Sequence, residues 1–229
     1  ACKEQKIPVI IIFEGFDAAG KGLQINKLIH PLDPRGFHVY AMKKETKTEQ
    51  MYPFLWRFWT KTPEKGRIAI FDTSWYRHVS VDFFEKKLSK EERNLAYQEI
   101  NTFERTLTDD GAVLIKLFLH ISKKDQKKRF EKLLESKETA WRVSREDLER
   151  NKNYDGYKSI LENMLEQTET EYAPWTIVEA TDKKYATAKI YATVIHQLEE
   201  ALKKRTVQKE EKQTCLLYTS PSPRDTERS

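Results

Sequence analysis

Apolar residues gather along the chain in short continuous runs, separated by longer stretches of mixed polarity. The first run occupies residues 7–14 and contains five consecutive apolar residues, Val9 to Phe13. Continuous runs rich in β-branched residues are typical of strands covered on both faces, as in a parallel sheet. The same pattern predicts further strands at residues 37–42, 67–71, 112–119 and 175–179.

The stretches between these runs have the spacing of amphipathic helices. Proline and glycine close the first of them, at Pro31, Pro34 and Gly36. Helices are predicted at residues 21–30, 50–60, 74–88, 90–108, 122–136, 148–170 and 183–204. Because strands alternate with helices, we expect an α/β fold with a doubly wound parallel sheet flanked by helices.

The segment after about residue 205 has a different character. Its end is rich in turn-forming residues and has no apolar periodicity. We therefore expect residues 1–205 to form one folded domain and residues 206–229 to be a disordered tail. The end of the tail also resembles translated adapter sequence, so a sequence artefact is an alternative origin for it.

Composition narrows the class of protein. With 229 residues, 38% of them hydrophobic and 34% charged, the chain can bury one ordinary core beneath a charged surface. The longest apolar run is far shorter than the ~20 residues that a membrane span requires, so we expect no membrane association. The two cysteines lie near opposite ends, which favours a reducing, cytoplasmic setting. The net charge is only +5 and the basic segments lack interleaved aromatic residues, so no nucleic-acid partner is expected.

Three of the seven glycines fall between residues 15 and 22, after the first predicted strand and before the first helix. The stretch matches the G-x-x-x-x-G-K phosphate loop, except that glycine replaces the usual Ser or Thr at its end. Backbone N–H groups in such a loop converge on phosphate oxygens, and the helix N-terminus adds its positive dipole end. The residues predicted to bind phosphate are Gly15, Ala18, Ala19, Gly20 and Gly22, with Lys21 as a catalytic residue. A simple glycine-rich turn is the alternative.

Two acidic residues are candidate metal ligands. Gly22 lacks the hydroxyl that normally helps to hold Mg²⁺, so a replacement oxygen ligand is needed, and Asp17 lies within the loop. Asp72 ends the strand predicted at 67–71, where ligands of open α/β sheets gather. Asp17 and Asp72 are therefore predicted to be catalytic and to bind Mg²⁺, with Mn²⁺ as an alternative ion. The alternatives are a local turn for Asp17 and a helix cap for Asp72.

Basic residues concentrate on the helix predicted at 122–136. Lys124, Lys128 and Lys132 are spaced i, i+4, i+8 and share one face, where a polyanion would relieve their repulsion. Arg145 and Arg150 extend the basic character further along the chain. The residues predicted to bind phosphate in these segments are Lys128, Arg129, Lys132 and Arg142, and Lys43 after the second strand is predicted to face the same cleft. The alternatives are a solvated helix face and, around Lys43, an exposed loop.

Seven short motifs carry a family resemblance. They are Phe-Glu-Gly-Phe-Asp-Ala-Ala-Gly-Lys-Gly (13–22), Leu-Asp-Pro-Arg-Gly-Phe (32–37), Phe-Leu-Trp-Arg-Phe-Trp (54–59), Phe-Asp-Thr-Ser-Trp-Tyr (71–76), Gln-Lys-Lys-Arg-Phe (126–130), Trp-Arg-Val-Ser (141–144) and Ala-Pro-Trp-Thr-Ile-Val-Glu-Ala (173–180). In their order and spacing, over about residues 7–204, the chain resembles the polyphosphate kinase 2 family, and within it the polyphosphate:AMP phosphotransferases.

This resemblance implies a P-loop kinase fold for residues 1–205, with a helical lid at roughly 129–153. It implies Mg²⁺-dependent, reversible transfer of a terminal phosphoryl group between inorganic polyphosphate and an adenine or guanine nucleotide, without a covalent enzyme intermediate. It further implies that Arg57 and Asp82 bind the nucleotide and that Arg77 binds phosphate. A homo-oligomer is expected on the same ground.

The chain departs from the family pattern at a few positions. Thr73 and Phe83 stand where relatives often have arginine, and His78 follows Arg77 in a shifted basic pair. These changes bear on rate and nucleotide preference more than on the reaction class. Two rival functions are an ATP-dependent nucleoside monophosphate kinase and a catalytically weak polyphosphate-binding domain. The sequence leaves open AMP against ADP as acceptor, the preferred direction and the chain length of the donor.

Overall fold

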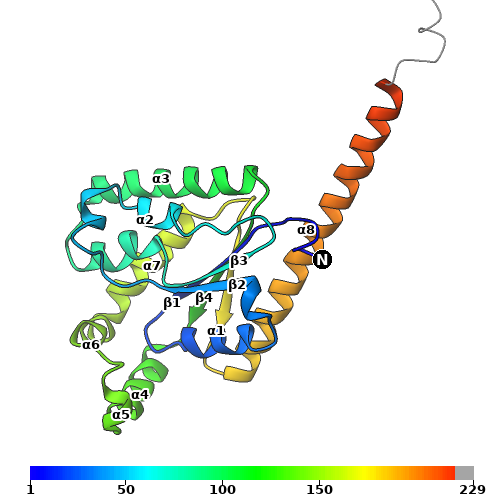
Figure 1. Ribbon diagram of the computed structural model, residues 1–229. Helices are drawn as coiled ribbons and strands as arrows, with labels where there is room; N and C mark the ends of the chain where they lie inside the picture. Colours follow the sequence, from blue (N-terminus) through cyan, green and yellow to red (C-terminus); the bar gives the residue numbers. More distant parts are fainter. Residues whose placement is uncertain (220–229) are drawn as a thin grey trace, which may run out of the picture.

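A five-stranded parallel sheet forms the centre of the molecule (Figure 1). The computed structural model describes the backbone of residues 1–219 and the side chains of residues 1–207. The strands are β1 (Val9–Gly15), β2 (Phe37–Ala41), β3 (Ile68–Asp72), β4 (Val113–His120) and β5 (Trp175–Glu179). Their order is β2-β3-β1-β4-β5, and every neighbouring pair is parallel. All five predicted strands are confirmed, and so is the doubly wound α/β fold.

Helices cover both faces of the sheet. Figure 1 shows α1 (Lys21–Ile29) and α8 (Lys183–Thr219) on one side, and α3 (Lys90–Asp109) and α7 (Tyr154–Gln167) on the other. The helices α4 (Lys123–Leu134), α5 (Lys137–Ala140) and α6 (Arg145–Lys152) lie together at one end of the molecule. Because α4 starts three residues after β4 ends, this group stands at the carboxyl-terminal edge of the sheet.

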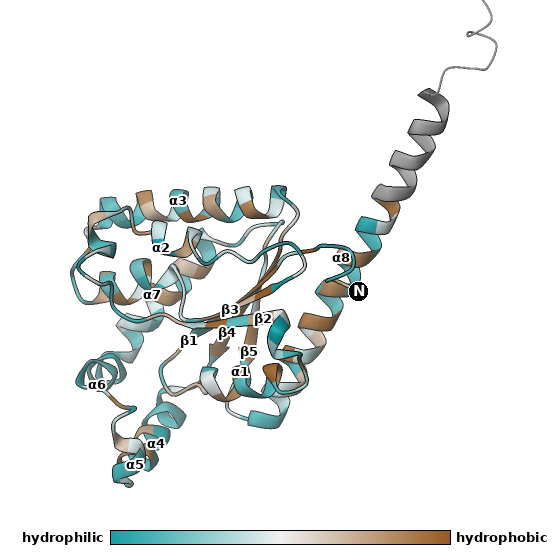
Figure 2. Ribbon diagram, in the orientation of Figure 1, coloured by the Kyte–Doolittle hydropathy of each residue, from teal (hydrophilic) through white to brown (hydrophobic). Residues whose placement is uncertain are grey.

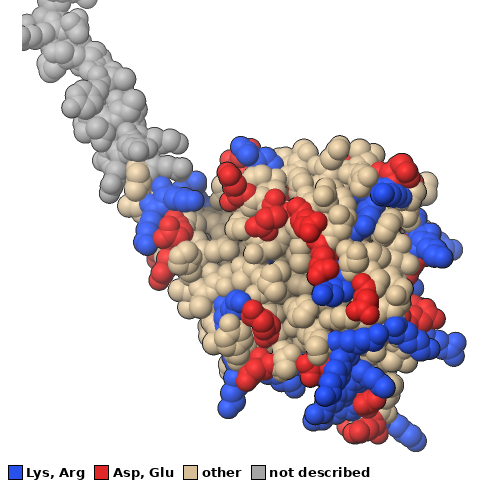
Figure 3. Space-filling view, turned by 180° about the vertical axis from the view of Figure 1, so that it is seen from behind, with Lys and Arg blue, Asp and Glu red and all other residues tan. Residues whose placement is uncertain are grey.

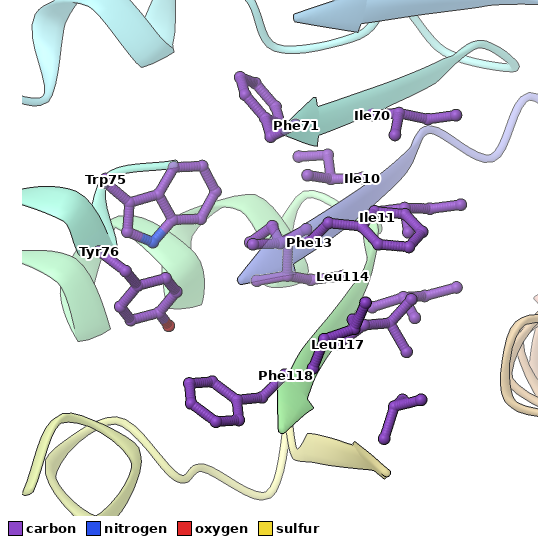
Figure 4. Packing of buried hydrophobic residues seen from close by; sticks show 14 of the residues in the cluster. Ile10, Ile11, Phe13, Ile70, Phe71, Trp75, Tyr76, Leu114, Leu117 and Phe118 are labelled. Atoms are coloured by element: carbon purple, nitrogen blue, oxygen red, sulfur yellow. The ribbon is translucent and has the colours of Figure 1, made fainter. Parts of the chain in front are cut away.

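The core lies between the sheet and its helices. The strands β1, β3 and β4 are coloured as the most hydrophobic part of the ribbon (Figure 2), as expected of strands buried on both faces. Trp75 and Tyr76 pack beside Phe13 and Phe71 at the end of the strands (Figure 4), and all four side chains are fully buried. The residues that directly follow Asp72 are therefore anchored in the core.

A buried ion pair strengthens that anchor. Glu104 of α3 and Lys116 of β4 are both inaccessible to solvent, and their charged groups lie 2.9 Å apart. Glu104 also accepts hydrogen bonds from the Trp75 indole and the Tyr76 hydroxyl, and Lys116 donates to the carbonyl of Thr168. Each charge therefore has several polar partners, as buried charges require.

Several predicted helices differ from the structure. The helix predicted at 50–60 is reduced to the single turns η2 (Glu49–Met51) and α2 (Trp56–Trp59), because Pro53 has no N–H and restricts its predecessor. Residues 76–84 form a shorter helix than the one predicted at 74–88, with the π-helical turn η3 (His78–Asp82) inside it. The helix predicted at 148–170 is two helices, α6 and α7, which meet at Asn153, whose backbone is not helical.

The last helix is longer than expected. The sequence predicts its end near residue 204 and a disordered tail from 206, whereas α8 continues to Thr219. No Gly or Pro interrupts residues 183–219, so nothing local stops the helix before Pro221. The rest of the predicted tail, residues 220–229, lies outside the described residues. Across residues 1–219, no helix combines the length and the apolar character that a membrane crossing demands.

Candidate active site at the phosphate loop

The phosphate loop turns sharply between β1 and α1 because of two glycines. At Gly15 φ is +127°, and a Cβ atom there would lie 2.2 Å from the carbonyl oxygen of Leu119 in β4. Only glycine permits this close approach of the two strands. Gly20 has φ +99° in the left-handed region and precedes the first residue of α1. The local geometry is therefore that of the predicted strand–loop–helix phosphate site.

Lys21 reaches back across the loop. Its Nζ donates to the carbonyl oxygens of Gly15 at 3.0 Å and Phe16 at 3.3 Å. The N–H groups in the first turn of any helix have no intrahelical acceptor, and within residues 1–207 no side chain caps the N-terminus of α1. A cation and a helix N-terminus thus point into one loop, which is the arrangement that binds phosphate.

Asp72 lies beside this helix start. It is paired in register with Phe13 at the end of β3, and its Oδ2 would be 4.0 Å from a Cβ atom at Gly22. The next segment is held by Glu14, whose Oε1 accepts from the backbone N–H of Ser74 at 2.7 Å and from its hydroxyl at 2.8 Å. Thr73, between Asp72 and Ser74 in the chain, has φ +68°, which is strained for a β-branched residue. The hydrogen bonds between Glu14 and Ser74 therefore fix the direction in which the chain leaves the sheet after Asp72.

Glu14 is a further ionisable group of this site. It is buried, and burial raises its pKa, although the nearby Lys21 and the hydrogen bonds from Ser74 oppose the shift. The charge of Asp72 adds to the rise. Glu14 thus stands within electrostatic range of both Lys21 and Asp72.

Asp17 is paired with an arginine of α6. Its Oδ2 lies 2.7 Å from Nε of Arg150, which also contacts Asp147 and, at 3.7 Å, Glu85. Arg150 is buried, and although burial alone would lower its pKa, the charge of Asp17 raises it above the usual arginine range. The same guanidinium lies over the ring of Tyr157. Arg150 therefore joins α6 to the phosphate loop.

The donors fit a magnesium site completed by substrate. Among the described side chains, no three His, Cys, Asp or Glu residues form a preassembled metal cluster. Mg²⁺, however, is commonly held by one or two carboxylates together with substrate phosphates and water. Asp17 and Asp72 are hard oxygen donors at the carboxyl edge of the sheet, Asp17 within the phosphate loop and Asp72 at the end of the neighbouring strand β3. Their chemistry agrees with the predicted ion, and their roles as ligands stay predictions.

Four of the predicted binding residues line one pocket. This pocket of about 350 Å³ lies next to Ser74 and contains Lys43, Arg57, Arg77 and Asp82. Its wall includes the stacked rings of Phe54 and His78, whose centroids are 4.3 Å apart. Three separate segments supply these side chains: the loop after β2, the turn α2 and the helix at residues 76–84 that contains η3. The fold therefore assembles residues whose grouping the sequence only implied by resemblance.

Arg57 and Asp82 give this pocket charges of opposite sign. The guanidinium of Arg57 is buried, and its Nε finds no aligned acceptor among the described residues, although Glu49 lies 3.3 Å away. Burial raises the pKa of Asp82, but the hydrogen bond from His78 and the charges of Arg77 and Lys87 outweigh it and hold the pKa below its usual value. A buried N–H without a partner is costly, so a ligand acceptor at Arg57 would be favourable.

The basic residues that were predicted to bind phosphate along residues 123–152 do not all line one hollow. Lys128 and Lys132 line a second hollow with Lys183 and Lys184, at the start of α8. Figure 3 shows Lys and Arg side chains gathered over this end of the molecule. Arg142 lies exposed on the segment between α5 and α6, against the ring of Trp141, and it lines neither hollow.

The side chain of Arg129 is bound to backbone carbonyl groups. The guanidinium donates to the carbonyl oxygens of Ala18 and Ala19 in the phosphate loop, and to those of Ala180 and Thr181 after β5. Four carbonyls therefore occupy the group that the sequence assigned to phosphate. Arg129 also lines the hollow of Lys128 and Lys132, and its role in binding phosphate stays a prediction. A charge count along a helix does not show that its guanidinium is bound to carbonyls.

Residues that the sequence did not single out also shape the site. Glu14 and Ser74 stand within the family motifs and Arg150 within a basic stretch, and none of the three was predicted to be a site residue. Gln126 is buried and donates from Nε2 to the carbonyl of Asp17 at 3.0 Å. The acidic residue that ends the apolar run at 7–14 was the one usable signal, because a carboxylate there must find partners inside the sheet edge.

Comparisons with known proteins agree with this geometry. A family model described as polyphosphate kinase 2 matches residues 1–206. The chain is similar to the polyphosphate:AMP phosphotransferase of Pseudomonas syringae pv. tomato, at 37% identity over 193 residues that make up 84% of this chain and 39% of that protein. It is also similar to the ADP-polyphosphate phosphotransferase of Rhodopseudomonas palustris, at 34% identity over 85% of this chain and 71% of that protein.

A solved structure matches as well. The crystal structure of polyphosphate kinase 2 from Arthrobacter aurescens TC1 superposes with a TM-score of 0.82 at 31% identity, covering 87% of this chain and 74% of that one. The chain spans about two fifths of the length of three of its curated relatives, between 39% and 41%. The family model nevertheless matches all but the last 23 of the 229 residues. The chain belongs to the polyphosphate kinase 2 family.

Proposed function

We propose that this chain transfers a terminal phosphoryl group, reversibly, between inorganic polyphosphate and a nucleotide. Adenine nucleotides are the first candidates for the acceptor and guanine nucleotides the second, since similar proteins are named for AMP, ADP and GDP. The observation that carries the proposal is the pocket of Lys43, Arg57, Arg77 and Asp82, which reaches Ser74. Ser74 is in turn bound to Glu14 of the phosphate-loop strand. An anionic acceptor in the pocket would therefore face the loop that holds the donor.

The residues of the site supply position and charge. The amides at the start of α1 and the Nζ of Lys21 would hold phosphate oxygens of the donor. Arg77 and Lys43 would hold the phosphate of the acceptor nucleotide, Arg57 would donate to the acceptor from the buried wall, and the stacked rings of Phe54 and His78 offer a face for the base. The acceptor oxygen is already anionic, so no strong general base is required. Catalysis then consists mainly of alignment and neutralisation of phosphate charge.

Asp17 and Asp72 are the residues that would hold Mg²⁺, or Mn²⁺ in its place. When bound, the ion would neutralise charge on the transferring phosphates. Arg150 would compete with the ion for Oδ2 of Asp17, which it contacts at 2.7 Å. The homo-oligomer and the cytoplasmic setting stay predictions.

The polyphosphate chain would extend along α4. Lys128 and Lys132, with Lys183 and Lys184, provide cations along a hollow near the phosphate loop. Such exposed lysines bind a polyanion mainly through charge, so binding would weaken as ionic strength rises. The helices α4–α6, which include the predicted lid, would close over the bound chain and exclude water.

The test compares donors and acceptors directly. The purified chain is incubated with Mg²⁺ and long-chain polyphosphate, with AMP, ADP or GDP in separate reactions, and the nucleotide products are separated. We expect AMP to yield ADP, or ADP to yield ATP. Parallel reactions supply ATP as donor in place of polyphosphate. Turnover with ATP and AMP alone would favour the rival nucleoside monophosphate kinase, and absence of turnover with every donor would favour a binding domain.

A further inference from the structure

Two side chains of α4 hold the outer side of the phosphate loop. Gln126 donates to the carbonyl of Asp17, and Arg129 donates to the carbonyls of Ala18 and Ala19, at 3.0, 3.0 and 2.9 Å. Three successive carbonyls of the loop are therefore bound by one helix. Both side chains lie at or just before the start of the predicted lid, residues 129–153.

These contacts determine where the loop amides point. In a trans peptide the C=O and N–H directions are opposite, so a carbonyl held on one side places the next N–H on the other. Binding the carbonyls of residues 17, 18 and 19 to α4 thus directs the N–H groups of residues 18, 19 and 20 toward the inner side of the loop. The N–H of Ala19 donates to the carbonyl of Phe16 across the loop at 3.2 Å, so phosphate would compete with that carbonyl for it. Ala18, with φ +56°, needs such an external restraint.

Gln126 and Arg129 each make further hydrogen bonds that hold their side chains in place. Gln126 is buried, and its Oε1 accepts from the side-chain amide of Asn151 in α6 at 2.8 Å. Arg129 uses its second terminal nitrogen on the carbonyls of Ala180 and Thr181, just before α8. A planar guanidinium with fixed donors can join these two backbone segments, which a lysine ammonium on a flexible stem cannot do in the same way.

We propose that Gln126 and Arg129 are positioning residues, which turn the amides of the phosphate loop toward phosphate instead of binding polyphosphate themselves. This inference rests on the proposed function for its catalytic consequence. It separates Arg129 from its neighbours Lys128 and Lys132, whose contribution would be charge alone. The same contacts link the position of α4 to the shape of the phosphate loop, so that displacement of α4 would leave the loop disordered.

The test uses a substitution that retains charge. Arg129→Lys keeps a cation but loses the planar fork, whereas Arg105→Lys is a matched change in an exposed ion pair with Asp109 on α3. Three quantities are measured for each: hydrogen exchange of peptides covering residues 16–21, the Kd for labelled polyphosphate, and kcat with its KM values. For Arg129→Lys we expect hydrogen exchange in the loop to rise, and kcat to fall, by about tenfold or more. Small misplacements of catalytic groups are costly. The Kd for polyphosphate should stay within about threefold, and Arg105→Lys should match the wild type in all three.

The alternative outcome is equally clear. Near-normal exchange and kcat in Arg129→Lys, with weaker polyphosphate binding in Arg129→Gln, would overturn the inference and restore Arg129 as a substrate contact. A role in stability alone would lower the unfolding temperature without a local rise in exchange or a loss of kcat in the folded protein, and it too would overturn the inference.

A second variant guards against a folding failure. Gln126→Met removes the bond to the carbonyl of Asp17, and with it the bond from Asn151, at similar side-chain volume. It should raise exchange in the loop, and unchanged exchange in a folded Gln126→Met would contradict the inference. If the wild type fails to turn over polyphosphate, the proposed function fails. The exchange measurements would still decide whether α4 orders the loop.

Discussion

Arg150 of α6 places its Nε 2.7 Å from Oδ2 of Asp17, the acidic residue of the phosphate loop. The guanidinium is surrounded by three carboxylates, those of Asp17, Asp147 and Glu85, and is itself buried. It therefore occupies Oδ2, one of the two carboxylate oxygens of Asp17 that a metal ion could bind. Glu85 also pairs with Lys87, so the three acids face two cations, and loss of the arginine would favour another cation in its place.

We predict that Arg150→Met destabilises the protein but strengthens its response to Mg²⁺. Removal of the guanidinium leaves three partly buried carboxylates without their shared partner, at a cost of about 1–3 kcal/mol. Urea unfolding with and without Mg²⁺ measures both effects. Added Mg²⁺ should raise the free energy of unfolding more in the variant than in the wild type. An equal Mg²⁺ response in the two proteins would show that Arg150 and the ion do not compete for Asp17.

Lys21 and Asp72 should be needed for turnover and not for folding. Lys21→Met removes the cation that crosses the phosphate loop, and Asp72→Asn removes a charge from the sheet edge. We expect kcat to fall roughly 10²–10³-fold in each, the loss typical of a deleted electrostatic contact in a transition state. Circular dichroism and the urea midpoint should stay close to those of the wild type. Near-normal rates in either folded variant would refute its catalytic assignment.

Arg57 should act on the nucleotide and not on polyphosphate. Its buried Nε has no aligned acceptor among the described residues, and a charge-assisted hydrogen bond to the acceptor is worth about 1.5–3 kcal/mol. Arg57→Gln should therefore raise the KM for nucleotide roughly tenfold to a hundredfold, with the KM for polyphosphate nearly unchanged. Arg35→Gln, in an exposed pair with Asp33, is the matched control. Equal increases in both KM values would remove Arg57 from the acceptor pocket.

Glu14 should make stability depend on pH. Burial raises its pKa above the ordinary 4.5, so the folded protein retains this proton to higher pH than the unfolded chain does. The stability that the protonated form contributes is present below pH 4.5 and is lost as the pH rises through the raised value. Glu14→Gln keeps an acceptor for Ser74 and removes the titration. Its stability relative to the wild type should therefore increase from pH 4 upward and then level off.

Urea unfolding of both proteins at several pH values from 4 to 8 measures this difference. Parallel stability curves would mean that Glu14 titrates alike in the folded and unfolded states. The same variant should retain activity, because the glutamine amide oxygen still accepts from Ser74 and so supports the segment that carries Asp72. Loss of activity in a folded Glu14→Gln would show that the site needs the charge of Glu14.

The sequence by itself determined the strands, the phosphate loop and the family, because these depend on local order. Five apolar runs became five parallel strands, and the glycines at 15 and 20 met steric demands that no other residue satisfies. Helix limits were less predictable. The breaks at Pro53 and Asn153 and the extension of α8 depend on single residues within long polar stretches.

Only the tertiary structure decided how the charged side chains are used. Glu14 and Ser74 are 60 positions apart, Asp17 and Arg150 are 133 apart, and Arg129 meets Ala18 across 111. Spacing along a helix shows which residues share a face, but a long arginine can turn toward substrate or toward backbone carbonyls from the same face. That choice is set by which unsatisfied oxygens the fold brings within reach, because a buried carbonyl without a donor is costly.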